Sequence, residues 1–194
     1  LRSIAVFDGF PFYRACKLIK RDRAKIVAVC DVSGSVARVV RFFLMLLYSL
    51  NEVVPEIESF AFSGRLEDVS DTLEGQDFAS AMDKIINAIG MSSTDYGQSL
   101  SDLKMNHWSV LDRRTTLIVL GDGRSNYGDP RVDLFQEAAA RVKRVIWLSP
   151  ESESLWGSGD SELPRYRPYC HTMKHVTTIK DLERILDEAL SRYQ

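Results

Sequence analysis

Cysteine is scarce in this chain, and neither sign of charge dominates it. The 194 residues include three cysteines, and 25 Lys and Arg stand against 27 Asp and Glu. Widely spaced cysteines in an odd number argue against a disulfide framework, so we expect a reducing compartment and a cytoplasmic protein. The near-neutral balance of charge gives no electrostatic reason to expect nucleic acid or a membrane surface as the main partner.

Long hydrophobic runs are missing as well. The longest apolar stretch, Phe42 to Leu50, is about half the length that a membrane-spanning helix needs, and we expect a buried helix there. The chain begins with Leu1 and not with Met, which indicates a fragment. Basic residues between Arg14 and Lys25 predict a solvated surface or linker. We therefore assign residues 1–24 to an N-terminal extension or linker and residues 25–194 to one globular domain.

The rest of the sequence alternates apolar β-forming runs with helical segments. Strands are predicted over residues 25–30, 56–62, 115–120, 144–149 and 175–179, with a weaker edge strand or turn over 65–73. Helices are predicted over residues 36–51, 77–89, 96–113 and 180–193, and another runs to about residue 142 from Asp129 as N-cap and Pro130 as first helical residue. This alternation indicates an α/β fold with a doubly wound, mostly parallel sheet flanked by helices.

Two short motifs deliver carboxylates to the ends of predicted strands. Asp31-Val32-Ser33-Gly34-Ser35 follows the first strand, and Gly121-Asp122-Gly123 follows the strand over 115–120. Ligand sites in such sheets lie beyond the carboxyl ends of the strands. Alternate residues of an extended turn point the same way, so the Asp and the two Ser of the first motif can face one point. Oxygen ligands of this kind suit a hard divalent cation, most simply Mg²⁺.

A third hydroxyl comes from Thr94, in the small-residue loop over 90–95. Without it, the first motif has another interpretation, in which Ser33 and Ser35 cap the next helix and Asp31 accepts from backbone amides. Thr94 and Asp122 together favour the metal site. Hydroxyls are neutral ligands, and most contacts of the carboxylates would be to the ligands and not to the cation itself. The bound cation would therefore keep positive charge and attract an acidic group from outside the domain.

These motifs resemble those of the von Willebrand factor A domains, whose metal-ion-dependent adhesion site combines Asp-x-Ser-x-Ser with a downstream Thr and Asp. The resemblance runs from Lys25 onward over nearly the whole chain. It implies a six-stranded Rossmann-like sheet of order 3-2-1-4-5-6. It also implies that Mg²⁺, or else Mn²⁺ or Ca²⁺, docks an Asp or Glu of a protein partner. The implied metal ligands are Asp31, Ser33, Ser35, Thr94 and Asp122.

A narrower resemblance lies in the last third of the chain. The segments over 147–151, 155–160 and 166–170 are similar to the CoxE-like branch of this family, bacterial proteins with a carboxy-terminal von Willebrand factor A domain. The branch implies work beside a MoxR-type AAA+ ATPase in maturing or activating metalloenzymes and other complexes. Gly121 stands where many relatives carry Ser or Thr, and we expect this departure to leave the metal shell unaffected.

The long irregular segment over 151–170 follows a parallel strand and should emerge at the same edge as the metal site. It could form a partner surface with the loop after Asp122, or its tryptophan could simply cover the core. The candidate partner-binding residues are Arg124, Asn126, Tyr127, Trp156 and Asp160.

Cys170, His171 and His175 could suggest zinc, but no fourth ligand or paired cysteine spacing supports such a site. We expect packing and surface roles for these three side chains.

An enzyme is the main alternative to a binding module. Asp31 after a strand, and Gly121-Asp122-Gly123 followed by Asp129, are also similar to haloacid dehalogenase-type phosphatases, in which Asp31 would be the nucleophile. Their second Asp is replaced by Ser33, which removes the usual general acid, and no catalytic lysine motif is evident between the two acidic strand ends. A purely structural domain is disfavoured by the complete set of metal-ligand types. We therefore expect a non-enzymatic, metal-dependent binding domain.

Overall fold

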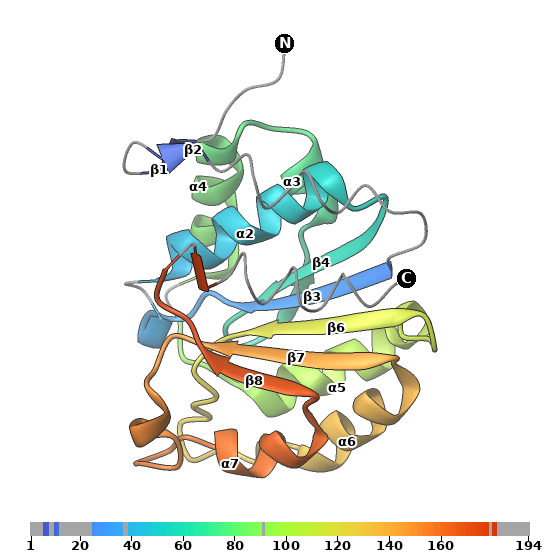
Figure 1. The fold of residues 1–194 in the computed structure, drawn as a ribbon, viewed down its shortest axis with the longest axis vertical. Helices are drawn as coiled ribbons and strands as arrows, with labels where there is room; N and C mark the ends of the chain where they lie inside the picture. The colour runs from blue at the N-terminus through green and yellow to red at the C-terminus, as the bar shows by residue number, and fades with distance from the viewer. Residues whose placement is uncertain are drawn as a thin grey trace.

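The computed structural model describes residues 6–7, 10–11, 25–36, 39–90, 92–178 and 180–181. Two short antiparallel strands, β1 (Val6–Phe7) and β2 (Phe10–Pro11), lie in the N-terminal part of the chain (Figure 1). The division into residues 1–24 and 25–194 stays a prediction. The predicted C-terminal helix falls almost entirely outside the described residues.

The described part of the chain contains a six-stranded sheet (Figure 1). Its strands are β3 (Lys25–Asp31), β4 (Glu56–Phe62), β5 (Leu66–Asp68), β6 (Thr115–Leu120), β7 (Arg144–Ser149) and β8 (Thr172–His175). They lie in the order β5-β4-β3-β6-β7-β8, and all neighbours pair in parallel except β4 and β5. Counted within this sheet, the order is 3-2-1-4-5-6, which confirms the predicted fold.

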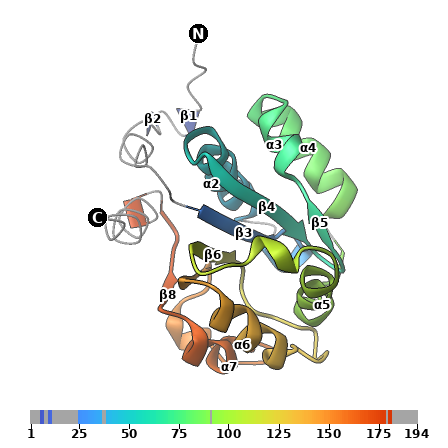
Figure 2. The same ribbon diagram turned by 90° about the vertical axis from the view of Figure 1, so that its right-hand side faces the viewer.

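Helices cover both faces of the sheet, as Figure 2 shows. One face carries α2 (Val40–Val53), α3 (Ser70–Glu74) and α4 (Phe78–Ile89). The other carries α5 (Tyr96–Asn106), α6 (Val132–Arg141) and α7 (Leu163–Tyr166). Within the described residues, no helix has both the length and the apolar character needed to cross a membrane.

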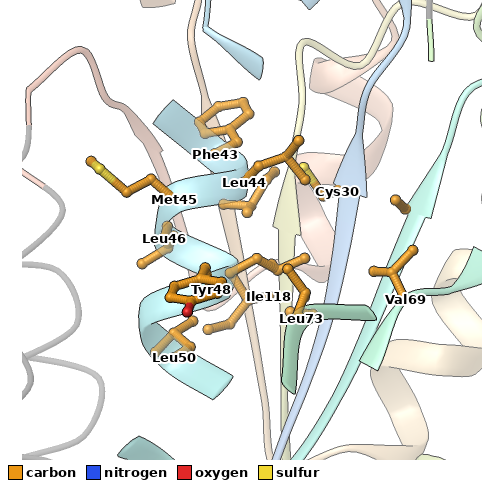
Figure 3. Packing of buried hydrophobic residues seen from close by; sticks show 14 of the residues in the cluster. Cys30, Phe43, Leu44, Met45, Leu46, Tyr48, Leu50, Val69, Leu73 and Ile118 are labelled. Atoms are coloured by element: carbon orange, nitrogen blue, oxygen red, sulfur yellow. The ribbon is translucent and has the colours of Figure 1, made fainter. Parts of the chain in front are cut away.

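The core on the α2 side is mostly aliphatic. Alternate residues of β3, among them Ile26, Ala28 and Cys30, point to this face because successive side chains of a strand point to opposite sides. Figure 3 shows Leu44 and Ile118 packed between α2 and the sheet. The strongly apolar sequence of α2 therefore corresponds to a helix buried against the sheet.

The core on the α5 side is rich in aromatic rings. Its buried aromatic residues are Phe60, Phe62, Tyr96, Phe135, Trp147 and Tyr166. Trp147 stacks on Tyr96 with ring centroids 5.6 Å apart and on Tyr166 at 4.9 Å. Rings of this kind combine a large buried area with a polar group that needs a partner. The polar groups of Tyr96 and Trp147 make their hydrogen bonds at the edge of the sheet where β3 and β6 end.

The start of α6 was predicted wrongly. The helix begins at Val132, not at Pro130, because its N-cap residue Arg131 adopts a left-handed conformation with φ of 46°. Asp129 does not cap α6; its Oδ1 accepts from the amide of Arg131 two residues further on, at 3.0 Å. A short polar side chain that bonds its own backbone two residues ahead forms a turn, and this turn delays the helix.

Other boundaries differ by a few residues. The helix predicted over 36–51 is observed as a 3-10 turn at Gly34–Val36 followed by α2, and α5 ends at Asn106, well before residue 113. The segment over 65–73 divides into β5 and the start of α3. The last strand lies at Thr172–His175, earlier than 175–179.

Candidate metal centre

Topology places the two acidic motifs side by side. Strands β3 and β6 are parallel neighbours, and Cys30 pairs with Leu120 just before each motif. Asp31 ends β3, and Asp122 lies two residues beyond the end of β6. Their exposed fractions are 0% and 2%. Two carboxylates are therefore buried together at the carboxyl edge of the sheet, where α/β proteins hold their ligands.

The environment of Asp31 opposes its negative charge. Burial raises the pKa of this carboxyl to about 7, and the nearby charge of Asp122 raises it as well. Hydrogen bonds work in the other direction: the amide of Ser33 donates to Oδ1 at 2.9 Å, and the hydroxyl of Tyr96 donates to Oδ2 at 3.1 Å. A cation at this position would relieve the repulsion between the two carboxylates.

Thr94 contacts the first motif, although the chain between them contains β4, β5 and the three helices α2, α3 and α4. Its hydroxyl donates to Ser33 Oγ at 2.6 Å, and both residues are buried. The loop is held in place by two backbone bonds, from the amide of Gly34 to Ser92 O at 3.4 Å and from the amide of Asp95 to Ser63 O at 2.9 Å. The alternative in which the first motif only caps a helix leaves this hydroxyl contact unexplained.

Ser35 completes the predicted set of metal ligands. It lies in the 3-10 turn at Gly34–Val36, directly after Ser33 in the same loop. Its side chain is outside the described part of the structure, so its role as a ligand stays a prediction.

Tyr96 belongs to the site but was not predicted as part of it. It is the first residue of α5, two residues after Thr94, and its side chain is buried. Besides donating to Asp31, its hydroxyl accepts from the amide of Gly123 at 3.0 Å. Nothing in the local pattern distinguishes this tyrosine from a helix residue that fills the core; its position two residues after the predicted Thr ligand was the available signal.

The loop after Asp122 also packs closely on the start of α5. A side chain at Gly97 would overlap with the backbone carbonyl oxygen of Asp129, so the absence of a Cβ allows this approach. The amide of Arg124 donates to Asp122 Oδ1 at 3.0 Å, which orients that carboxylate. The segments that carry Thr94 and Asp122 are thus fitted to one another through backbone contacts.

The donor set fits a divalent cation of the hard class. Carboxylate and hydroxyl oxygens from Asp31, Ser33, Thr94 and Asp122 come from three loops and are all buried at one edge of the sheet. Ions such as Mg²⁺, Mn²⁺ and Ca²⁺ favour oxygen ligands, whereas zinc sites use mostly nitrogen and sulfur.

Arg124 and Asp160, two of the candidate partner-binding residues, are bound to each other. The guanidinium of Arg124 contacts Glu151 Oε1 and Asp160 Oδ1, each at 2.8 Å. Asp160 Oδ2 also accepts from the amide of Asn126 at 3.0 Å. These contacts join the loop after Asp122 to the segment over 151–170, so both segments do emerge at the same edge.

Asn126 and Tyr127 form the tip of the loop after Asp122. The side-chain amide of Asn126 donates to Thr94 O at 2.8 Å and to Ser93 Oγ at 2.9 Å. Both tip residues have positive φ, 47° and 61°. Asparagine adopts this left-handed region readily, whereas a bulky residue such as Tyr127 adopts it only when its surroundings hold it there. Tyr127 is 84% exposed. An aromatic ring is therefore presented to solvent beside the site on a constrained backbone.

Trp156 covers part of the aromatic core. Its indole N–H donates to Glu151 O at 3.0 Å, and Arg167 lies over its ring at 5.6 Å. The irregular segment is thus packed on the domain and includes two 3-10 turns, at Glu153–Leu155 and Arg167–Tyr169, besides α7.

Cys170 and His171 have packing contacts. The thiol of Cys170 donates to Tyr166 O at 3.5 Å, and His171 Nδ1 accepts from the amide of Val145 at 3.1 Å. Across the residues that the structure describes, no group of three or more His, Cys, Asp or Glu side chains is arranged to hold a metal.

Several solved structures share the fold of this chain at low sequence identity. A von Willebrand factor type A protein from Catenulispora acidiphila matches with a TM-score of 0.61 at 14% identity, over 87% of this chain and 42% of that one. Proximal thread matrix protein 1 from the mussel byssus, solved with a zinc-occupied MIDAS motif, matches with 0.57 at 18% identity, over 87% and 47%. Manganese-loaded TRAP protein of Plasmodium vivax matches with 0.57 at 11% identity, over 87% and 73%.

The chain spans less than half the length of the first two of these proteins. No curated protein matches the sequence. The sequence profile of a family described as "VWA domain containing CoxE-like protein" matches residues 9–185, which is most of the chain. The chain therefore belongs to the CoxE-like proteins with a von Willebrand factor A domain.

Proposed function

We propose that this domain binds a divalent cation at the carboxyl edge of the sheet and uses it to dock an Asp or Glu of a protein partner. The convergence of three loops carries the proposal: the hydroxyls of Ser33 and Thr94 lie 2.6 Å apart, beside the buried carboxylates of Asp31 and Asp122. Membership of the family and the metal-loaded sites of its structural neighbours support a metal-dependent interaction domain. The assigned ligands are Asp31, Ser33, Ser35, Thr94 and Asp122.

Each ligand type has a separate task. The hydroxyls of Ser33, Ser35 and Thr94 offer neutral oxygens. Asp31 and Asp122 supply negative charge, and both are oriented by backbone amides, those of Ser33 and Arg124. When bound, the cation supplies positive charge that the neutral hydroxyls do not cancel, and a carboxylate from outside can satisfy it. We propose Mg²⁺ as the resident ion, with Mn²⁺ or Ca²⁺ as the alternatives.

Calorimetric titration with Mg²⁺ and Mn²⁺ tests the metal site. The wild type should bind one ion, and Asp31→Ala should not bind it, because one of the two carboxylates that supply negative charge to the site is lost. Asp83→Ala is the matched control, since it removes an exposed carboxylate on α4 and should leave the affinity unchanged. Equal binding by wild type and Asp31→Ala would overturn the site.

The double variant Ser33→Ala plus Ser35→Ala tests docking. It should lose the partner in a pull-down while circular dichroism shows an intact fold. A matched control is Ser80→Ala plus Ser109→Ala, which alters two exposed serines on α4 and on the turn after α5, near the opposite edge of the sheet. Retention of the partner by the Ser33 and Ser35 variant would refute docking through the metal.

We propose a MoxR-type AAA+ ATPase as the partner and the cytoplasm of a bacterium as the location. Membership of the CoxE-like family supports this proposal, because the resemblance to that branch implies work beside such ATPases in enzyme maturation or activation. Titration of the purified ATPase onto the domain, with and without EDTA, measures the complex directly. If EDTA does not weaken the complex, the ATPase binds to the domain without using the metal site.

A phosphatase that uses Asp31 as nucleophile is the competing function, and no observation favours it. Both carboxylate oxygens of Asp31 already accept hydrogen bonds, and position 33 carries a hydroxyl in place of an acid. An assay with a generic phosphate ester decides the matter: we expect no turnover, and turnover that disappears in Asp31→Asn would establish the phosphatase.

A further inference from the structure

The hydroxyl of Tyr96 links the ends of both acidic strands. It donates to Asp31 Oδ2 at 3.1 Å and accepts from the amide of Gly123 at 3.0 Å, so it uses its donor and one acceptor position on opposite sides of the site. The side chain is 3% exposed.

The hydroxyl fits because position 121 carries no side chain. A Cβ built on Gly121 would overlap with the Tyr96 hydroxyl oxygen and would stand 2.9 Å from Asp31 Cβ. A larger residue at 121 would displace either the phenol or the carboxylate. The glycine at position 121 thus provides the space that the Tyr96 hydroxyl occupies, and the two residues are steric complements. The replacement of Ser or Thr by Gly121 therefore affects the residues that contact the metal ligands.

The ring of Tyr96 is held by the aromatic core. It packs edge-on against Phe62, with centroids 4.9 Å apart, and stacks on Trp147 at 5.6 Å. Trp147 in turn donates its indole N–H to Gly121 O at 2.9 Å. The aromatic core thus determines where the hydroxyl lies and where the backbone before Asp122 lies.

We propose that Tyr96 is a positioning residue of the metal site, which holds the carboxylate of Asp31 and the backbone after Asp122 in register, with Gly121 as its steric complement. The inference rests on the proposed function, because positioning matters only if a cation binds there. Groups that orient metal ligands typically change metal affinity by about 10- to 100-fold when they are removed.

The first test is Tyr96→Phe, which keeps the ring and removes the hydroxyl. Calorimetry should show that the affinity of this variant for Mn²⁺ is about tenfold lower than that of the wild type, or lower still, while circular dichroism stays unchanged. Tyr166→Phe is the matched control: it removes a buried hydroxyl of the same core, which donates to Pro130 O at 2.5 Å. The electron paramagnetic resonance spectrum of bound Mn²⁺, which reports the arrangement of its ligands, should change in Tyr96→Phe and stay constant in Tyr166→Phe.

The second test is a double-mutant cycle with Gly121→Ala. Alone, this substitution should weaken Mn²⁺ binding, because the added methyl group displaces the hydroxyl or Asp31. In the Tyr96→Phe background the same substitution should cost less, since the closest overlap is gone. If Gly121→Ala alone does not fold, folding of the double variant supports the pairing, and failure of both variants refutes it.

The outcomes distinguish the two proposals. Mn²⁺ affinity in Tyr96→Phe equal to that of the wild type overturns the positioning role alone, as does an equal loss in the Tyr96 and Tyr166 variants. Additive effects in the cycle overturn the pairing with Gly121. A wild type that binds neither Mn²⁺ nor Mg²⁺ removes the metal site, and the positioning role with it.

Discussion

The two cores on either side of the sheet differ in their relation to the site. On the α2 side the core is mostly aliphatic, and the hydroxyl of Tyr48 bonds Gln76 O, away from the ligands. On the α5 side, three aromatic side chains turn their polar ends to the edge of the sheet. Tyr96 reaches Asp31 and Gly123, Trp147 reaches Gly121, and Tyr166 reaches Pro130.

This difference separates stability from metal binding. Apolar packing on either face contributes to the free energy of unfolding in proportion to the area buried. On the aromatic face, the polar ends of Tyr96 and Trp147 also determine where the backbone on both sides of Asp122 lies, whereas the hydroxyl of Tyr166 bonds Pro130 O. We therefore expect substitutions on the two faces to have similar effects on stability and different effects on metal affinity.

The largest effect should come from truncating one leucine in each core. Leu47 and Leu163 are both fully buried, and each change to Ala should lower the free energy of unfolding by about 2–5 kcal/mol. Leu163 lies against Gly123, and the amide of Glu162 donates to Gly123 O at 2.8 Å, so Leu163→Ala should also weaken Mn²⁺ binding. Urea unfolding and calorimetry measure both quantities. Equal losses of affinity in the two variants would end the distinction between the cores.

Acidification should act next most strongly, and through Asp31. The pKa of Asp31 in the folded, metal-free protein is about 7, whereas the ordinary value of an Asp side chain is 3.8. Between these two pH values the folded state therefore keeps a proton that the unfolded chain releases. Stability of the metal-free protein from this group should therefore fall as pH rises from 4 to 7. Mn²⁺ must displace the same proton, so its affinity should fall by about tenfold per pH unit below 7.

Chemical unfolding and calorimetry across this pH range, in wild type and Asp31→Asn, provide the check. In Asp31→Asn the stability should lose the part of its pH dependence that comes from this carboxyl. Identical pH profiles of the two proteins would show that another group is responsible.

Trp147→Phe should have a smaller effect on stability. The substitution keeps a ring and removes the donor to Gly121 O, which leaves a buried carbonyl unpaired at a cost of about 1–3 kcal/mol. Metal affinity should fall too, because the strand end before Asp122 is released. The comparison is Trp108→Phe, a half-buried indole beside Lys104 and Arg141, for which calorimetry should show wild-type affinity.

The smallest effect on the domain itself should come from its exposed side chains. Tyr127→Ala and Met105→Ala remove side chains that are 84% and 80% exposed, and each should change stability by less than about 0.5 kcal/mol. Only Tyr127 stands beside the site, so only its removal should weaken binding of the partner in a titration. An equal loss in both variants would place the partner elsewhere.

The strands over 56–62, 115–120 and 144–149 could be predicted with their bounds. The first alternates polar and apolar residues, the other two are largely apolar β-forming runs, and each ends at polar or small residues. Asp31, Ser33, Thr94 and Asp122 could be placed together because their motifs follow strands, or a loop, at one edge of the sheet. These inferences need only local pattern and the topology of a parallel sheet.

The supporting contacts could not be predicted in this way. The link from Tyr96 to Asp31 exists because Gly121 leaves space for it, and the ion pairs of Arg124 with Glu151 and Asp160 join two loops that local pattern does not relate. The left-handed Arg131 at the start of α6 likewise reflects the packing of a turn. Periodicity reports on faces of helices and strands, whereas these features depend on distances between distant segments.

The close approach of Asp129 to Gly97 has a consequence for protein engineering. Transfer of the five ligand positions to another parallel sheet would omit the backbone contact through which the start of α5 accommodates the loop after Asp122. Any side chain at position 97 would push that loop outwards and move Asp122 away from Thr94. A transfer of the metal site to another sheet should therefore include the ligands, the segment Thr94-Asp95-Tyr96-Gly97, and Gly121, which leaves space for the Tyr96 hydroxyl.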